Sequence, residues 1–301
     1  MSLPTHVKIV EVGPRDGLQN EAVDVSADVK IRLINQLVEA GVSYIEAGSF
    51  VNPKWVPQMA SSEAVFTQLV HSDNITYAAL TPNLKGFERA ISVNVTEVAI
   101  FAAASEAFSQ KNINCSIAES IARFEPVMAA AKQANVKVRG YVSCVLGCPY
   151  QQEVPISDVV RVSTQLFDMG CYEISLGDTI GIGTPTKVKE LIAELSKVIP
   201  IETLAVHFHD TYGQALANIY AALECGITVV DSSISGLGGC PYAKGASGNV
   251  ATEDLVYMLN GMGIVHGIDL DKLITAGNNI SLFLQRPNGS KVASARVNRS
   301  N

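Results

Sequence analysis

The chain has 301 residues, of which 48% are hydrophobic and 17% are charged, a balance that can bury a sizeable core and excludes a disordered composition. Twenty-nine acidic residues against 22 basic ones give a formal charge of −7, which disfavours binding to a polyanion, so nucleic acid is not an expected partner. No stretch approaches the roughly 20 apolar residues of a membrane span, and the N-terminal residues show no signal or transit pattern, so we expect a cytoplasmic protein that contacts no membrane.

Short β-branched runs alternate with helical patterns along most of the chain. Eight such runs predict strands, at 8–12, 43–47, 75–80, 97–102, 137–142, 172–176, 204–208 and 228–232. Segment 29–40 places its apolar residues on one stripe and ends before Gly41, a typical C-cap residue, and segment 186–198 follows the same pattern after Pro185. The sequence therefore predicts repeated βα units around a parallel sheet.

Eight βα units predict a closed (β/α)8 TIM barrel of the α/β class. An open sheet fits less well, because no GxGxxG turn follows the first strand. We expect a single catalytic domain over 1–301, with the barrel at about 7–265. The remainder, 266–301, is predicted to hold one short extra helix at about 269–284 and a polar, frayed tail.

The cysteines are scattered along the chain, which predicts reduced thiols rather than a disulfide framework. The six positions are Cys115, Cys144, Cys148, Cys171, Cys225 and Cys240. Cys144 and Cys148 have a loosely metal-like spacing, but no second cysteine pair accompanies them, so buried or loop cysteines are expected there.

The segment HFHD at 207–210 predicts half of a metal site. Side chains alternate along a strand, so His207 and His209 point to the same side. A lone histidine is most often a hydrogen-bonded core residue, but a pair at this spacing followed by aspartate favours a chelate. Asp16 and Asn249 add hard oxygen ligands, and this mixture suits a divalent cation of the Mg²⁺ or Mn²⁺ type.

Other polar residues gather near the ends of predicted strands, where barrel enzymes build their active sites. They are Arg15, Glu46, Ser49, Tyr141, Ser175 and Asp178. An exposed ion pair is the alternative for Arg15 and Asp16, but their place among glycines at a strand end favours a pocket.

The segment 236–249, GLGGCPYAKGASGN, follows the eighth predicted strand and contains five glycines. Such a loop can form a mobile lid, while a phosphate cradle or a plain connector are the alternatives. Cys240 lies inside it. A thiol there contributes little to packing, which favours a reactive role.

These motifs resemble the 3-hydroxy-3-methylglutaryl-CoA lyase family across nearly the whole chain. The resemblance is carried by GPRDGLQNE, SFVNPKWVPQM, RGYVSCVLGCPY, EISLGDTIGIGTP, HFHDTYGQALAN and GLGGCPYAKGASGN. RDG and HxHD alone would indicate only the wider superfamily of metal-dependent aldolase and acyl-transferase barrels, which includes isopropylmalate and homocitrate synthases. The cysteine loop narrows the choice to the lyase, and those synthases usually carry a further C-terminal domain.

The resemblance implies roles for the candidate residues. The implied metal ligands are Asp16, His207, His209 and Asn249, and the implied catalytic or supporting residues are Arg15, Asp16, Glu46, Asp178, His207 and Cys240. Arg15 would face the thioester carbonyl and Cys240 would take part in proton transfer. Arg15, Ser49, Asn112, Tyr141 and Ser175 are the implied substrate contacts. The group that takes the proton of the substrate alcohol is left open between Asp16 and His207.

The implied reaction is the metal-dependent cleavage of 3-hydroxy-3-methylglutaryl-CoA to acetyl-CoA and acetoacetate, a step of leucine degradation and ketone-body formation. The alternatives are a lyase for another 3-hydroxy-3-alkylglutaryl-CoA and an acyl-CoA-condensing synthase of the same superfamily. A catalytically silent binding or scaffold protein is disfavoured, because all the ligand positions are present. A homodimer is expected. Since the last cysteine is Cys240 and the chain ends in Arg-Ser-Asn, neither an intersubunit disulfide nor a peroxisomal address is expected.

Overall fold

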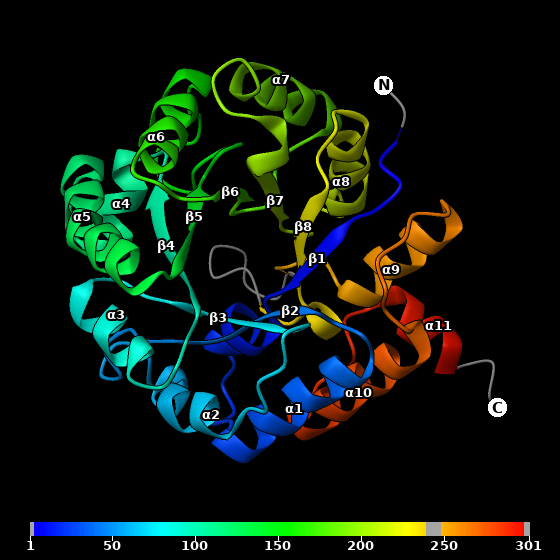
Figure 1. Ribbon diagram of the computed structural model, residues 1–301. Helices are drawn as coiled ribbons and strands as arrows, with labels where there is room; N and C mark the ends of the chain where they lie inside the picture. Colours follow the sequence, from blue (N-terminus) through cyan, green and yellow to red (C-terminus); the bar gives the residue numbers. More distant parts are fainter. Residues whose placement is uncertain (1–2, 239–247, 298–301) are drawn as a thin grey trace.

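A computed structural model describes residues 3–238 and 248–297 of the chain. Its centre is a closed barrel of parallel strands, seen nearly end-on in Figure 1. The strands are β1 (Lys8–Glu11), β2 (Tyr44–Ser49), β3 (Thr76–Leu80), β4 (Glu97–Ala103), β5 (Lys137–Ser143), β6 (Glu173–Asp178), β7 (Leu204–Phe208) and β8 (Val229–Ser232). Each pairs with the next, and β8 pairs with β1, so the predicted (β/α)8 barrel is confirmed.

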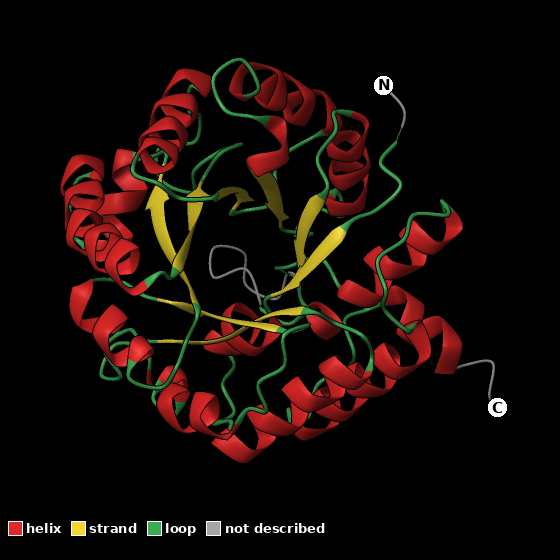
Figure 2. Ribbon diagram, in the orientation of Figure 1, coloured by secondary structure: helices red, strands yellow, loops and turns green. Residues whose placement is uncertain are grey.

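Helices surround the barrel, as Figure 2 shows. They are α1 (Ala27–Glu39), α2 (Ser62–Gln68), α3 (Leu84–Ile91), α4 (Glu106–Ile113), α5 (Ile117–Ala134), α6 (Ile156–Asp168), α7 (Pro185–Leu195), α8 (Ala215–Glu224), α9 (Thr252–Gly261), α10 (Leu270–Phe283) and α11 (Lys291–Val297). Short helical turns η1 (Gly13–Gly17), η2 (Pro57–Met59), η3 (Ile201–Thr203) and η4 (Ile234–Gly236) lie between them. None of the helices in the described ranges has the length and apolar character to cross a membrane.

Local chemistry accounts for several helix ends. Ser116 and Glu119 form a reciprocal capping box at the start of α5. Gly41 follows α1 with a φ of +95°, a left-handed conformation in which glycine has no side-chain penalty, as the sequence predicted. The helix predicted at 186–198 ends earlier, at Leu195.

The observed strands match the predicted ones to within two residues, with one consequence for the site. Strands β2 and β6 run two residues further than predicted, so Ser49 and Asp178 are the last residues of their strands rather than loop residues beyond them. The register between β2 and β3 also shifts between Glu46 and Gly48, which changes the alternation of side chains before Ser49.

The prediction of a frayed tail was wrong for residues 291–297, and residues 298–301 lie outside the described residues. The chain forms α11 at Lys291–Val297, and Ala293 is fully buried. Its start is held by Asp254 of α9, whose Oδ1 accepts a hydrogen bond of 2.6 Å from Ser290 Oγ and whose carboxylate also accepts the backbone N–H of Lys291. This tertiary cap stabilises a short helix that its own sequence would not.

The barrel interior is charged, while the layer between strands and helices is apolar. Arg139 of β5 lies at the centre: its Nε is 2.6 Å from Glu173 Oε1, and its Nη2 is 2.7 Å from Asp231 Oδ1. Lys8 at the start of β1 extends the network, with Nζ 2.8 Å from Glu173 Oε2. Arg139 and Asp231 are each about 1% exposed, and a buried charge persists only when it is paired in this way.

Candidate metal centre

Three of the predicted ligands converge at the C-terminal end of the barrel. Asp16 lies in η1, directly after β1, and His207 and His209 lie in and just after β7. One ligand atom from each of the three side chains lies within 4.8 Å of the others. The alternation of side chains along β7 puts both imidazoles on the inner side, while Phe208 packs into the core on the other.

The ring of His207 is oriented by Asp231 of β8. Its Nδ1 lies 3.3 Å from Asp231 Oδ2, and its Nε2 lies 4.0 Å from Asp16 Oδ2. Burial opposes the ionisation of Asp231, but the charge of Arg139 lowers the pKa of this carboxyl below its usual value. Because an ionised carboxylate only accepts, Nδ1 carries the ring proton and Nε2 is left to face Asp16.

The protonation states suit metal binding. Burial, followed by the charge of His207, lowers the pKa of His209 to about 4, so its ring is neutral at pH 7. Burial would raise the pKa of Asp16, but the charges of Arg15 and His207 and the hydrogen bond from Asn249 together outweigh it, and the pKa falls to about 2. Burial likewise opposes a charge on His207, yet Asp231 and Asp16 raise its pKa above the usual value, and a bound cation would displace that proton. Nδ1 of His209 is buried and has no hydrogen-bond partner among the described residues, as expected of a site built for a further group.

Asn249 completes the set of four predicted ligands. Its Nδ2 donates to Asp16 Oδ2 at 2.7 Å and to the carbonyl of Leu237 at 3.2 Å, which directs its amide into the cluster. Its backbone forms a bridge with that of His209. Two imidazoles, a carboxylate and an amide match the donors that Mg²⁺ and Mn²⁺ accept, so the residues present fit such an ion.

Arg15 lies beside the cluster in a fixed position. Its Nε donates to Glu46 Oε2 at 2.6 Å, and its Nη1 donates to Asp16 Oδ1 at 2.7 Å. Its guanidinium also lies over the ring of Tyr141, 5.8 Å from the ring centroid. Burial would lower the pKa of Arg15, but Glu46 and Asp16 keep it above the usual value, so a permanent cation is held beside the ligands.

Apart from Arg15, the predicted substrate contacts lie in different parts of the structure. Tyr141 and Ser175 point into the barrel: the Tyr141 hydroxyl accepts from Arg139 Nη1 at 2.7 Å, and Ser175 Oγ donates to Asp231 Oδ2 at 2.8 Å. Ser49 is buried at the end of β2, with its backbone N–H on Ser62 Oγ. Asn112 is exposed on α4, which follows β4, and within the described ranges it joins none of the contacts above.

Asp178 faces the loop after β6 rather than the ligand cluster. Asp178 and Ser175 are three residues apart on β6, so their side chains point to opposite faces of the strand. Asp178 Oδ2 accepts the backbone N–H of Gly183 at 2.8 Å. A Cβ at Gly183 would lie only 2.8 Å from the same oxygen, so the loop is pressed against the carboxyl. Burial, outweighing its backbone donors, raises the pKa of Asp178 to about 6.

This raised pKa predicts a pH-dependent contribution to stability. The folded protein keeps the Asp178 proton at pH values where the unfolded chain, with a usual pKa of 3.8, has lost it. The contribution is therefore fully present below about pH 4 and is lost as the pH rises through about 6. We expect Asp178→Asn, which cannot ionise, to gain in free energy of unfolding relative to the wild type between these values. Urea unfolding from pH 4 to pH 7 measures it, and parallel profiles for the two proteins would contradict the prediction.

Asp231 and Arg139 are the functional residues that the sequence analysis missed. Arg139 lies in the middle of its predicted strand, but Asp231 lies one residue before the end of 228–232, the same place that Glu46 has in 43–47. A signal was available: Lys8, Glu97, Arg139, Glu173 and Asp231 are all charged residues inside predicted strands. Such residues are rarely buried unless paired, so several of them together indicate a polar barrel interior.

The structure describes five of the six cysteines. Cys240 and most of its glycine-rich loop lie outside the described residues. The other five cysteines are free thiols, and Cys144 and Cys148 are buried, as expected. Cys148 Sγ accepts from Ser105 Oγ at 3.0 Å, and burial raises the pKa of Cys144, which disfavours the reactive thiolate of that residue.

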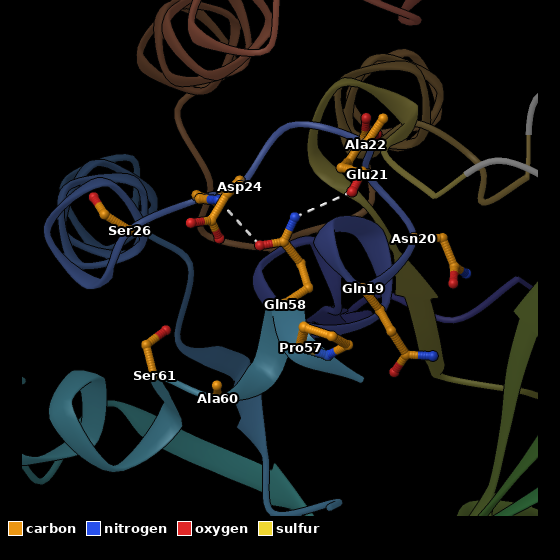
Figure 3. Close-up of a pocket in the computed structure, with 11 residues that line it drawn as sticks. Gln19, Asn20, Glu21, Ala22, Asp24, Ser26, Pro57, Gln58, Ala60 and Ser61 are labelled. Carbon is orange, nitrogen blue, oxygen red and sulfur yellow. Dashed lines mark hydrogen bonds between the residues drawn. The ribbon is translucent and has the colours of Figure 1, made fainter. Parts of the chain in front are cut away.

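A surface pocket of about 680 Å³ lies beside the segment that follows η1 (Figure 3). Gln58 of η2 forms one wall, and its side chain binds the backbone of Val25 and Glu21. The lining residues are Gln19, Asn20, Glu21, Ala22, Asp24, Val25, Ser26, Pro57, Gln58, Ala60 and Ser61. None of them is a predicted ligand, so this pocket is separate from the metal cluster.

Comparisons with known proteins find similarity along nearly the whole chain. The family model HMGL-like matches residues 6–280. The chain is 59% identical over 295 residues to a Pseudomonas aeruginosa protein named 3-hydroxy-3-isohexenylglutaryl-CoA/hydroxy-methylglutaryl-CoA lyase, covering 98% of each chain. It resembles the crystal structure of hydroxymethylglutaryl-CoA lyase from P. aeruginosa with a TM-score of 0.98 at 58% identity, covering 99% of this chain and 100% of that one. An Acinetobacter baumannii HMG-CoA lyase in complex with coenzyme A and 3-methylmalate gives a TM-score of 0.92 at 39% identity, with 98% and 96% covered.

Proposed function

The chain belongs to the HMGL-like family, and we propose that it is a metal-dependent carbon–carbon lyase that cleaves 3-hydroxy-3-methylglutaryl-CoA to acetyl-CoA and acetoacetate. The observation that carries this proposal is the cluster of Asp16, His207 and His209 beside the fixed cation of Arg15, at the catalytic end of the barrel. Similarity to named lyases over 98% of the chain supports the same reaction. The enzyme would act in leucine degradation.

We assign Asp16, His207, His209 and Asn249 as the residues that hold Mg²⁺ or Mn²⁺. The ion supplies Lewis acidity that makes the tertiary hydroxyl of the substrate more acidic. The ligand atoms of Asp16, His207 and His209 lie within 4.8 Å of one another, so these residues would fix where that hydroxyl lies.

Arg15 stabilises the charge that develops as the carbon–carbon bond breaks. The bond between C2 and C3 of the acyl group cleaves, C3 becomes the ketone of acetoacetate, and the electron pair moves into the thioester to give an enolate. Arg15 is aimed and held by Glu46 and Asp16 before the reaction begins, so no reorganisation is needed when the enolate oxygen becomes negative. Glu46 and Asp178 act as positioning residues, the first on Arg15 and the second on the loop after β6.

Two proton transfers complete the reaction. For the hydroxyl proton, we assign Asp16, acting through a water, because both ring nitrogens of His207 are engaged, Nδ1 with Asp231 and Nε2 toward the ion. We assign the protonation of the acetyl-CoA enolate to Cys240, on the basis of its place in the glycine-rich loop of the sequence.

We further propose that Ser49, Asn112, Tyr141 and Ser175 contact the acyl-CoA, of which Tyr141 and Ser175 also position Arg139 and Asp231. A homodimer and a cytoplasmic location remain part of the proposal; the free thiols of the five described cysteines are consistent with a reducing compartment.

A second substrate is favoured by one observation. The P. aeruginosa relative is named for an isohexenylglutaryl-CoA as well as for the methyl compound. A substrate with a longer 3-alkyl chain is therefore the main alternative. A condensing synthase is less favoured, because the relatives that match over the whole chain are named lyases.

The proposal predicts metal-dependent release of both products. Enzyme stripped with a chelator is expected to be inactive on 3-hydroxy-3-methylglutaryl-CoA and to recover on addition of Mg²⁺ or Mn²⁺, forming acetyl-CoA and acetoacetate in equal amounts. The measurement is product chromatography, with the isohexenyl substrate assayed in parallel. Full activity after chelation, or turnover of the longer substrate alone, would overturn the assignment.

A further inference from the structure

Glu11, the last residue of β1, is a buried carboxyl without a role in the chemistry above. It is fully buried. Its side chain points away from the barrel interior, to the side opposite Val10 and Val12, so it does not reach the ligand cluster. Within the described ranges, no lysine or arginine forms an ion pair with it. A buried carboxyl is costly unless its oxygen atoms accept hydrogen bonds, so the partners of Glu11 indicate its role.

Those hydrogen bonds join three separate backbone segments. Oε1 of Glu11 accepts the N–H of Gly13 at 2.7 Å and the N–H of Ile234 at 2.8 Å, and Oε2 accepts from Thr252 Oγ1 at 2.6 Å. Gly13 begins η1, which carries Arg15 and Asp16. Ile234 begins η4, which follows β8, and Thr252 begins α9, three residues after Asn249.

The same three segments are packed with no space between them. A Cβ on Gly13 would lie 2.6 Å from Glu11 Oε1 and 2.7 Å from the side chain of Ile234. A Cβ on Gly17 would lie 2.7 Å from both Ser233 and Leu237, and one on Gly238 would lie 2.7 Å from Asn249 Nδ2. The relative placement of Asp16 and Asn249 therefore depends on how closely these backbones approach.

Turn η4 is held from its other side by a second buried carboxyl. Both oxygens of Glu253 accept the N–H of Ser235, at 3.1 and 2.9 Å. Ser235 has a φ of +56°, which is uncommon for a residue other than glycine and persists only where surrounding contacts impose it. Turn η4 is thus fixed between Glu11 and Glu253.

We propose that Glu11 is a positioning residue that sets the distance between the Asp16 side and the Asn249 side of the metal centre, by binding the backbones that carry both. This inference rests on the metal-dependent function proposed above. Glu11 is not itself a ligand. The length of its side chain determines whether the Asp16 carboxylate and the Asn249 amide lie close enough to bind the same ion.

Two substitutions separate the effect of the length of the Glu11 side chain from the effect of its charge. Glu11→Gln keeps the length: its amide oxygen can accept both N–H groups, and its amide nitrogen can donate to Thr252. Glu11→Asp keeps a carboxyl but is one methylene shorter. Burial, opposed by the three hydrogen bonds, raises the pKa of Glu11 to about 7, so glutamine also resembles the neutral acid that is partly populated there.

The test measures the dissociation constant of Mn²⁺ without substrate, by titration followed with electron paramagnetic resonance. We expect Glu11→Asp to weaken Mn²⁺ binding by about 10- to 100-fold, as changes behind a ligand shell do, and to alter the spectrum of the bound ion. Glu11→Gln should bind Mn²⁺ nearly as the wild type does. If Glu11→Asp does not fold, Thr252→Val, which removes a single hydrogen bond, should show a smaller loss in the same direction.

The matched control is Glu97→Gln. Glu97 is a buried carboxyl at the opposite end of the barrel, bound by the hydroxyls of Tyr44 and Tyr172. Its replacement should lower thermal stability and leave the Mn²⁺ affinity and spectrum unchanged. Unchanged Mn²⁺ affinity in Glu11→Asp, or equal losses in the Gln and Asp variants, would overturn the inference.

The same titration separates failure of the inference from failure of the function. If the wild type binds no Mn²⁺ and cleaves no substrate, the proposed function itself is wrong. If the wild type does both and Glu11→Asp does so equally well, only the role of Glu11 is wrong.

Discussion

Replacing His207 or His209 by alanine is expected to lower turnover by about 10³-fold and to weaken Mn²⁺ binding in parallel. The loss corresponds to about 4 kcal/mol, within the several kcal/mol that a Lewis acid contributes to a transition state. The barrel should remain folded, because both side chains lie at the strand end and Phe208, which packs into the core, is unchanged. In His207→Ala, Asp231 keeps its hydrogen bonds to Arg139 and Ser175, so no buried charge loses its last partner.

The measurements are kcat for 3-hydroxy-3-methylglutaryl-CoA and the Mn²⁺ dissociation constant. His6→Ala is the matched control, since His6 is exposed and its ring contacts Thr5. It should change neither quantity. Normal Mn²⁺ affinity in the double variant of His207 and His209 would show that the ion binds elsewhere, and the assignment of the site would then be wrong.

The fold followed from the sequence because local patterns repeat in a strict order. Each predicted strand lies within two residues of an observed one, and helix 29–40 ended at Gly41 as expected. The ends of β2 and β6 were less predictable. Ser49 and Asp178 continue the pairing with Leu80 and Phe208, and nothing local to their own sequences indicates how far a neighbouring strand extends.

The clustering of Asp16, His207 and His209 was predictable from the sequence, while the contacts of the residues behind them were not. The spacing of His207 and His209 can be read directly from the four-residue segment HFHD. Asp231 binds His207 only because the barrel closes with β7 beside β8, and it meets Arg139 across 92 residues of sequence. Contacts of this kind depend on the register of several strands at once, which hydrophobic periodicity does not determine.

The last helix, α11, also depends on a contact that the sequence pattern does not reveal. Segment 291–297 is short and lies within the mostly polar stretch 290–301, so a stable helix was not expected there. It is helical because Asp254, in the preceding α9, caps it through Ser290, Lys291 and Val292. A tertiary partner therefore decided a local structure.

Replacing Arg15 by lysine is expected to lower kcat by about 10² to 10³, with little change in the KM for the acyl-CoA. Removal of one preorganised donor from a developing oxyanion has an effect of this size. Lysine keeps the charge but has no planar fork, so it cannot bind Glu46 and Asp16 at the same time as it points toward the substrate. The loss should therefore be confined to the transition state, in which the enolate oxygen is negative.

Two controls make this prediction specific. Arg15 contacts Asp16, so the Mn²⁺ affinity of Arg15→Lys must be measured, and we expect it to stay near that of the wild type because the lysine charge still keeps Asp16 ionised. Arg89→Lys, which changes an ion pair with Glu63 at the surface, should leave kcat unaltered. A rise in KM at constant kcat would instead make Arg15 a ground-state binding residue. Stabilisation of the enolate would then have to come from another group at the mouth of the barrel, and Tyr141, whose ring centroid lies 5.8 Å from the Arg15 guanidinium, is one candidate.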